Sequence, residues 1–250
     1  MLQREIWGQT FDVMPATILQ VVAHVGGVAA GAFDAAGALA GFVFGVTGVV
    51  DDKIIHWSHV LGVRPELRNA GVGRVLKEYQ RRDLARRHIG EMYWTYDPSI
   101  AKNAHFNVNV LGARVVRFTP DMYGDTGSPL HHGLPTDRLV VVCDTARPAR
   151  DASSAIGRAD ARTPLLTIEP RTGDSVLDRG APPPLRARLE IPSDFAQLLA
   201  DAPRDARAWH TATREHFQWA LASGYTVTGF ARDSETARSF YLLERELRDL

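Results

Sequence analysis

The sequence is poor in cysteine and in long apolar runs, and each scarcity excludes a class of structure. The one cysteine, Cys143, rules out a disulfide within the chain, and its apolar surroundings indicate a buried structural thiol rather than a nucleophile. Every apolar stretch is broken by Gly, Asp or His well short of the ~20 residues that a membrane helix needs. No group of Cys, His, Asp and Glu has the spacing of a metal site, so we expect no metal.

Net charge is absent as well. Lys plus Arg equal Asp plus Glu at 29 each, so no overall basic field attracts nucleic acid or a membrane surface. Only Lys53, Lys77 and Lys102 are lysines, which fits a GC-rich coding sequence better than an arginine-specific task. The first residues lack a charged segment followed by an apolar one. We therefore expect a cytoplasmic protein with neither a nucleic-acid nor a membrane partner.

The hydrophobic pattern predicts a mixed α/β fold. With 45% hydrophobic and 23% charged residues, the 250-residue chain has the composition of a globular protein. Apolar spacing predicts helices and strands in alternation. The expected helices are 15–25, 74–90, 100–111 and 195–223, the last interrupted near Ala202-Pro203, and the expected strands are 28–33, 39–50, 53–63, 91–96, 114–118, 139–144, 165–168, 185–191, 225–231 and 239–243.

Composition changes in the last third of the chain. Residues 147–184 are rich in Pro, Gly and Ser and are predicted to form an irregular connection. Residues 185–250 contain many aromatic residues that need burial, so we expect an ordered α/β extension packed on the first domain. The expected organisation is a domain over 1–146, a connection over 147–184 and an extension over 185–250.

The most informative segment runs from His56 to Gly73, where an apolar strand leads into a glycine-containing turn and then a helix. Arg68, Gly71 and Gly73 have the order R-x-x-G-x-G. Backbone N–H groups at a helix start lack helical partners and can bind a pyrophosphate, and glycine lets the backbone approach it closely. A dinucleotide fingerprint would need a third glycine where Leu76 stands, and the Gly-Lys-Ser/Thr ending of a Walker loop is absent.

This motif, after a strand ending in Leu61-Gly62-Val63, resembles the acyl-CoA site of the Gcn5-related N-acyltransferase (GNAT) superfamily. The resemblance covers about residues 10–146. It implies a mixed, mostly antiparallel sheet flanked by helices and an acyl-CoA co-substrate. Trp94 to Pro98, Asn103-Ala104 and Gly133 to Arg138 resemble one poorly characterised bacterial and archaeal branch, some of whose members are associated with N-acylamino-acid metabolism.

The resemblance assigns a cofactor site and an oxyanion donor. A slot for the pantetheine arm is implied between the strand 53–63 and the strand 91–96, with the backbone N–H near Val60 and Leu61 as the oxyanion donor. The residues expected to bind CoA are Leu61, Val63, Arg68, Asn69, Ala70, Gly71, Val72, Gly73, Arg74, Asn103 and Phe106.

His59 is the first candidate for the general base. Strand alternation places His59, Leu61 and Val63 on one face and His56 and Ser58 on the other, unless a bulge intervenes. His59 falls where arylalkylamine acyltransferases of the superfamily carry one histidine of a catalytic pair, and the partner position holds Trp57, a candidate substrate contact. Histidine titrates near neutral pH and can accept a proton. A purely structural histidine at the sheet edge is the alternative.

The general acid is harder to locate, because the family's usual tyrosine position, four residues before Gly112, holds Val108. Tyr96, His105 and Tyr123 are the candidate substitutes.

Two charged residues are candidates for the acceptor end. Asp97 could orient an amine or act as a base, or it could simply form an Asp-Pro turn. Arg138 could bind an acceptor carboxylate bidentately, or pair with Asp137 or another neighbour.

Three functions are consistent with these residues. The leading one is an acyl-CoA-dependent N-acyltransferase that moves an acetyl or succinyl group to a small amine, with an amino acid favoured by the branch resemblance. The missing tyrosine keeps open a non-catalytic acyl-CoA-binding regulator or scaffold, and a protein acetyltransferase is the third. The sequence does not decide between a monomer and a homodimer.

Overall fold

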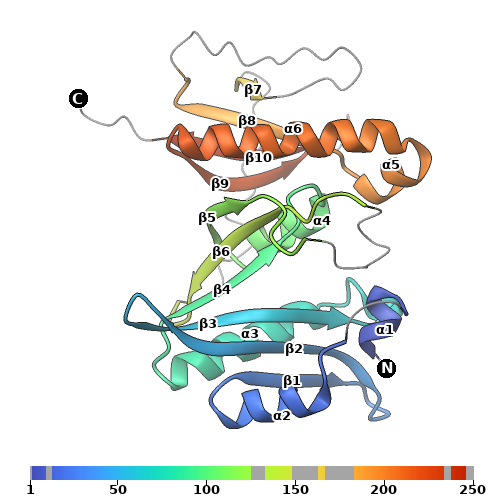
Figure 1. Ribbon diagram of the computed structural model, residues 1–250, viewed down its shortest axis with the longest axis vertical. Helices are drawn as coiled ribbons and strands as arrows, with labels where there is room; N and C mark the ends of the chain where they lie inside the picture. The colour runs from blue at the N-terminus through green and yellow to red at the C-terminus, as the bar shows by residue number, and fades with distance from the viewer. Residues whose placement is uncertain are drawn as a thin grey trace. The chain divides into compact units, whose positions relative to one another are not determined.

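Figure 1 shows a computed structural model of the chain, which describes residues 2–9, 13–124, 133–147, 163–166, 183–233 and 238–245. The chain divides into two compact units. The first comprises Met1–Thr95, Tyr123–Pro135 and Val141–Ala149, and the second comprises Tyr96–Met122, Thr136–Val140 and Arg150–Leu250. The domain boundaries expected at residues 146 and 184 stay a prediction.

One sheet has the strand order β1-β2-β3-β4-β6-β5. Its strands are β1 (Val28–Phe33), β2 (Leu39–Val50), β3 (Lys53–Val63), β4 (Glu91–Tyr96), β5 (Arg114–Thr119) and β6 (Arg138–Asp144). Pairs β1/β2 and β2/β3 are antiparallel, whereas β3/β4 is parallel. The helices of the first unit are α1 (Leu2–Trp7), which the hydrophobic pattern did not predict, α2 (Ala16–His24) and α3 (Val72–Arg86). The predicted mixed, mostly antiparallel α/β class is confirmed.

Helix α3 lies on one face of β2 and β3 (Figure 1). The side chains buried from α3 are Leu76, Lys77, Gln80 and Leu84. Val75 and Tyr79, two further apolar residues of the helix, are 64% and 50% exposed. The helix also begins two residues before the expected Arg74, because Gly71 in the left-handed conformation is its N-cap.

Glycines on β2 let α3 approach the sheet. A Cβ at Gly45 would lie 2.2 Å from His56 Nε2 and 2.9 Å from Gln80 Nε2. At Gly41, a Cβ would lie 2.7 Å from the Gly62 carbonyl oxygen and 3.2 Å from a Leu76 methyl. Neither position has room for a side chain while β3 and α3 keep their places.

The second sheet has the order β7-β8-β10-β9. Its members are β7 (Leu165–Leu166), β8 (Arg186–Ile191), β9 (Tyr225–Arg232) and β10 (Ser239–Arg245), preceded or interleaved by α5 (Phe195–Asp201) and α6 (Pro203–Ala222). The interruption predicted at Ala202-Pro203 is confirmed, since α6 starts with proline at its first position. Residues 167 and 168 of the expected strand 165–168 lie outside the described residues.

An aromatic cluster forms the core of the second unit. Phe217 of α6 packs edge-on against Tyr241 of β10 at 4.9 Å between ring centroids and stacks on Phe118 of β5 at 5.9 Å. Phe230 of β9 meets Tyr241 at 5.1 Å. Phe217, Phe230 and Tyr241 are therefore buried, as predicted for the aromatic residues of the extension, whereas Trp209 and Trp219 are half-buried. The buried cluster holds β5 against the second sheet.

The helix expected over Ile100–Leu111 is divided in two. Only α4 (Ala101–Ala104) is α-helical, and the next six residues form the π-helix η2 (His105–Val110). The Leu111 N–H donates to the Phe106 carbonyl five residues back at 2.9 Å. Asn109, buried in η2, donates to the Phe230 carbonyl at 2.7 Å and accepts the Phe230 N–H at 3.1 Å, so β9 stabilises the wider turn.

Candidate functional site

Strand β3 separates from β4 within a few residues. Their paired residues are His56 with Met92 and Trp57 with Tyr93, whereas β3 remains paired with β2 as far as Val63. The segment of β3 beyond Trp57 therefore has, among the described residues, no register partner in β4. The sequence interpretation expected an opening beside the phosphate-binding strand here, and its use as a cofactor slot stays a prediction.

A β-bulge at His59 lies where the two strands separate. Ser58 pairs with Gly45 and Val60 with Phe44, which leaves His59 as the extra residue of β3. The extra residue reverses the alternation, so Leu61 falls on the same face as Ser58. The alternation that placed His59 with Leu61 and Val63 is therefore wrong, and the exception made for a bulge applies.

The turn after β3 has the backbone geometry of an anion cradle. Asn69 and Gly71 both adopt positive φ, at 69° and 83°. Space around Gly71 is open, since a Cβ there would meet no atom within 4 Å. At the start of α3, the Val75 N–H donates to the carbonyl oxygen of the N-cap residue Gly71 at 3.1 Å. The amides before it point out of the helix start, next to the exposed Arg68 and Arg74.

His59 is exposed, and its ring lies edge-on to Phe44 with 6.4 Å between centroids. The protein around the rest of the ring desolvates it and lowers the pKa of His59 below the usual 6.5. The imidazole is thus neutral at pH 7 and can accept a proton. Trp57 is half-buried and stacks in parallel with Tyr93 at 6.4 Å.

A buried lysine lies beneath the same strand, and the sequence interpretation missed it. Lys77 is only 4% exposed; its Nζ donates to Ser58 Oγ at 2.7 Å and lies 4.1 Å from the centre of the Trp94 ring. Burial lowers the pKa of Lys77 from 10.5 to about 7. The sequence did carry a signal for it: the polar residues Lys77 and Gln80 fall on the same face of the helix as the apolar Leu76 and Leu84.

His56 belongs to the same buried layer. Its Nε2 lies 2.9 Å from Gln80 Nε2 and its Nδ1 lies 3.0 Å from Thr47 Oγ1. Burial, followed by the nearby Lys77 charge, lowers the pKa of His56 to about 4. His56 is therefore a neutral structural group, distinct in role from the exposed His59. Cys143 is also structural, because burial raises the pKa of its thiol to about 11.

In the second unit, the acceptor candidates Asp97 and Arg138 come together. Arg138 Nη1 lies 3.8 Å from Asp97 Oδ2 and donates to the Asp137 carbonyl oxygen at 2.8 Å. Asp97 also forms the expected turn, because its Oδ1 accepts the Ser99 N–H at 2.8 Å. Of the partners considered for Arg138, Asp137 thus contributes its backbone carbonyl, while the Asp137 carboxylate binds Arg214.

The candidate acids differ in their surroundings. Tyr96 is buried, and burial raises its pKa well above 10. Its neighbour Tyr241 donates to the Pro98 carbonyl at 2.9 Å. His105 is exposed at the start of η2, with Nδ1 3.2 Å from Asn109 Nδ2. In the first unit, the Tyr123 hydroxyl lies 3.0 Å from Thr95 Oγ1.

The remaining CoA candidates lie on the divided helix. Asn103 is half-buried in α4, and its carbonyl oxygen accepts the Asn107 side-chain amide at 2.8 Å. Phe106 is half-buried in η2. Val108, at the family's tyrosine position, is buried.

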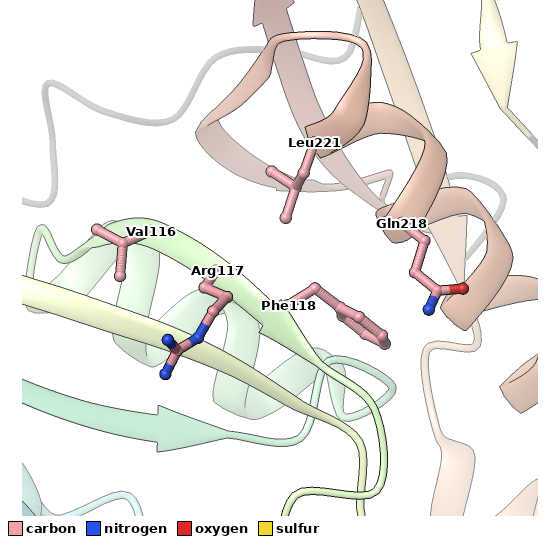
Figure 2. Close-up of a pocket in the computed structure, with 5 residues that line it drawn as sticks. All are labelled: Val116, Arg117, Phe118, Gln218 and Leu221. Atoms are coloured by element: carbon pink, nitrogen blue, oxygen red, sulfur yellow. The ribbon is translucent and has the colours of Figure 1, made fainter.

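A shallow hollow of about 270 Å³ lies between β5 and α6, lined by Val116, Arg117, Phe118, Gln218 and Leu221. Figure 2 shows Leu221 and Gln218 of α6 facing the strand, while the Arg117 guanidinium is turned away from them. None of the sequence-predicted site residues lines it. In the described ranges, His, Cys, Asp and Glu form no group that could hold a metal ion, and no helix combines the length and apolarity needed to cross a membrane.

No protein-family model and no curated protein matches the chain. Solved structures similar to it include Chaetomium thermophilum Naa20 in complex with a bisubstrate analogue, at 20% identity over 55% of this chain and 77% of that one, TM-score 0.46. The Escherichia coli ribosomal-protein-S18-alanine N-acetyltransferase matches at 17% identity over 60% and 88%, TM-score 0.41. An aminoglycoside 6'-acetyltransferase type Ii matches at 18% identity over 60% and 88%, TM-score 0.44. These values are too low to assign a function, which has to be argued from the chain's own residues.

Proposed function

We propose that the chain is an acyl-CoA-dependent N-acyltransferase of the GNAT superfamily that transfers an acetyl or succinyl group to a small amine, with an amino acid as the favoured acceptor. One observation carries the proposal. The bulged strand β3 separates from β4 at His59 and then leads into a left-handed turn and the open amides of α3. The R-x-x-G-x-G residues of the GNAT motif occupy that turn. The proposed setting is the cytoplasm.

The turn fits the pyrophosphate of CoA. The amides of Asn69 and of Gly71 to Arg74 would donate to phosphate oxygens, and Arg68 and Arg74 would add positive charge. Room for the phosphates exists at Gly71, which has no atom within 4 Å of the place of a Cβ. Leu61 and Val63 would line the pantetheine arm along β3, and Asn103 and Phe106 are the candidates on α4 and η2.

His59 supplies the base. The acceptor nitrogen attacks the thioester carbonyl carbon, the C–S bond breaks and CoA leaves as its thiolate, while His59 accepts the proton lost from nitrogen. The lowered pKa of His59 suits this role, because the ring is neutral at pH 7. Val60 and Leu61 pair with Phe44 and Val43 of β2 but have, among the described residues, no register partner in β4, which supports an oxyanion donor on the β4 side of the strand.

Tyr96 is a poor proton donor to the leaving thiolate, because burial raises the pKa of its phenol well above that of a thiol. The proton that the thiolate takes up would come from His105, Tyr123 or solvent.

The acceptor site is proposed at Asp97 and Arg138. The closest atoms of this pair are 3.8 Å apart, beyond hydrogen-bond distance. An amino acid complements them, since its ammonium group suits Asp97 and its carboxylate suits the Arg138 guanidinium.

A non-catalytic acyl-CoA-binding regulator is the second candidate, favoured by the buried Val108 at the usual tyrosine position. Thiol release from acetyl-CoA and succinyl-CoA, measured against a panel of amino acids and amines, separates the two. Acceptor-dependent release establishes the enzyme. Tight CoA binding without release for any acceptor overturns it in favour of the regulator.

The cradle is tested with Gly71→Glu, which adds a negative charge and a side chain where phosphate would bind. We expect a loss of CoA affinity of at least 100-fold by calorimetry. Gly37→Glu is the matched control: Gly37 has nearly the same φ, 81°, and equally open surroundings, but lies in the β1–β2 turn. Equal CoA affinity in both variants would contradict the assignment.

A further inference from the structure

The carboxylate of Asp137 is fully engaged by residues of the C-terminal helix. It is 2% exposed, and Arg214 of α6 binds it bidentately, with Nε to Oδ2 at 2.8 Å and Nη2 to Oδ1 at 2.6 Å. His210, one turn earlier on α6, places Nε2 3.6 Å from Oδ2. The Asp121 N–H donates to Oδ1 at 2.9 Å. Such a buried carboxylate depends on its partners for charge compensation.

This cluster reaches the proposed acceptor site through one residue. Arg138 follows Asp137 in the chain, and its Nη1 donates to the Asp137 carbonyl at 2.8 Å. Arg214 neutralises the Asp137 carboxylate, while Arg138 Nη1 lies 3.8 Å from Asp97 Oδ2.

We infer that Arg214 and His210 are positioning residues of α6 that keep Arg138 available for an acceptor carboxylate, so that the C-terminal segment sets the preference for amino acids over simple amines. The inference rests on the proposed function. Neither positioning residue has to touch the substrate: Arg214 acts by occupying Asp137, and His210 supports the same carboxylate.

Removal of Arg214 has a specific consequence. The buried Asp137 carboxylate loses its counter-charge, and Arg138 is the adjacent cation that can replace it. An Arg138 recruited to Asp137 no longer binds the acceptor. The KM for carboxylate-bearing acceptors should rise, while the KM for acyl-CoA and the rate with the corresponding amide should not.

The test compares Arg214→Ala, Arg214→Lys and the double variant Asp137→Asn/Arg214→Ala in the full-length chain. Each is assayed by thiol release with the best amino acid of the panel and with its carboxamide. We expect Arg214→Ala to raise the amino acid's KM at least tenfold and leave the carboxamide's unchanged, and Arg214→Lys to retain part of the preference. The double variant should restore it, because a neutral amide in place of the Asp137 carboxylate no longer competes for Arg138.

Arg204→Ala, an exposed arginine on the same helix, is the control and should behave as wild type. A loss in Arg214→Ala that affects amino acid and carboxamide equally, or that the double variant fails to rescue, overturns the inference while the acyl transfer stands. If the wild type shows no turnover, the proposed function fails. Binding of glycine and of glycinamide, compared by saturation-transfer NMR, then tests the inference. A glycine preference that Arg214→Ala abolishes supports it, and no preference or an unchanged one overturns it.

Discussion

Burial lowers the pKa of two nitrogen bases near β3, His59 and Lys77, but the two side chains differ in their contact with solvent. His59 remains exposed at the bulge, whereas Lys77 is enclosed between α3, Ser58 and Trp94. A base in contact with solvent can exchange protons with a substrate. A base without such contact affects stability instead, because its charging opposes folding.

His59→Gln tests the base. In the wild type, kcat/KM should fall as the pH drops through the pKa of His59, which lies below 6.5, because the protonated ring cannot accept a proton. The variant should lose about 10²–10⁴ in rate and lack this acidic limb. His24→Gln, an exposed histidine on α2, is the control. An unchanged limb in His59→Gln would assign it to another group.

Lys77→Met tests the buried amine. The pKa is 10.5 unfolded and about 7 folded, so between these values the unfolded chain binds more protons and the free energy of unfolding rises with pH. Below pH 7 the amine is charged in both states and the full penalty applies. The variant should be more stable at pH 7 by about 1–4 kcal/mol and lose this slope in denaturant titrations. Lys53→Met, at an exposed position, should change little; a destabilised Lys77→Met would show that its hydrogen bond outweighs its desolvation.

At the scale of elements, β2 carries glycines of two kinds. Gly45 faces α3 and has no space for a Cβ, whereas Gly48 is exposed and a Cβ there would meet nothing within 4 Å. The same residue type therefore serves close packing at one position and no packing at the other.

Gly45→Ala should destabilise the protein by about 1–3 kcal/mol, because His56, Gln80 and the Trp57 carbonyl must shift. Gly48→Ala, in the same strand, should be neutral or stabilising by about 0.5 kcal/mol, since it restricts the unfolded chain. Thermal unfolding of the two variants measures the contrast. Equal effects would mean that the α3 contact does not limit β2.

The strands of the first unit were predictable because alternation is a local signal: 28–33, 39–50, 53–63 and 91–96 were predicted with the observed bounds. The bulge at His59 and the π-helix η2 were not, because each is fixed by a partner distant in sequence. For the site, R-x-x-G-x-G identified the turn, whereas the Arg214 contact with Asp137 spans 77 residues and leaves no local pattern.

At the scale of the whole molecule, the second unit joins segments that the sequence separates. Phe118, Pro98 and Asn109 all contact residues beyond 215, through Phe217 and through the bonds to Tyr241 and Phe230. The segment between Tyr96 and Met122 therefore completes its core with the C-terminal part of the chain.

A chain ending at residue 146 should consequently lack a cooperative unfolding transition, because Phe118 and η2 lose their buried contacts. Circular dichroism during thermal unfolding measures this, with residues 1–245, which retain β10, as the control. Cooperative unfolding of the 1–146 chain would instead support an independent domain with the boundary expected from composition.

The burial of Lys77 has a consequence for chemical labelling. Lys53 and Lys102 are exposed, so an amine-reactive acylating reagent modifies them in the folded state. Lys77, with a pKa of about 7 caused by burial, is largely shielded from the reagent by its enclosure. The extent of Lys77 acylation, measured by mass spectrometry relative to that of the two exposed lysines, would report how often α3 leaves the sheet. Lys77 is thus a probe of local opening.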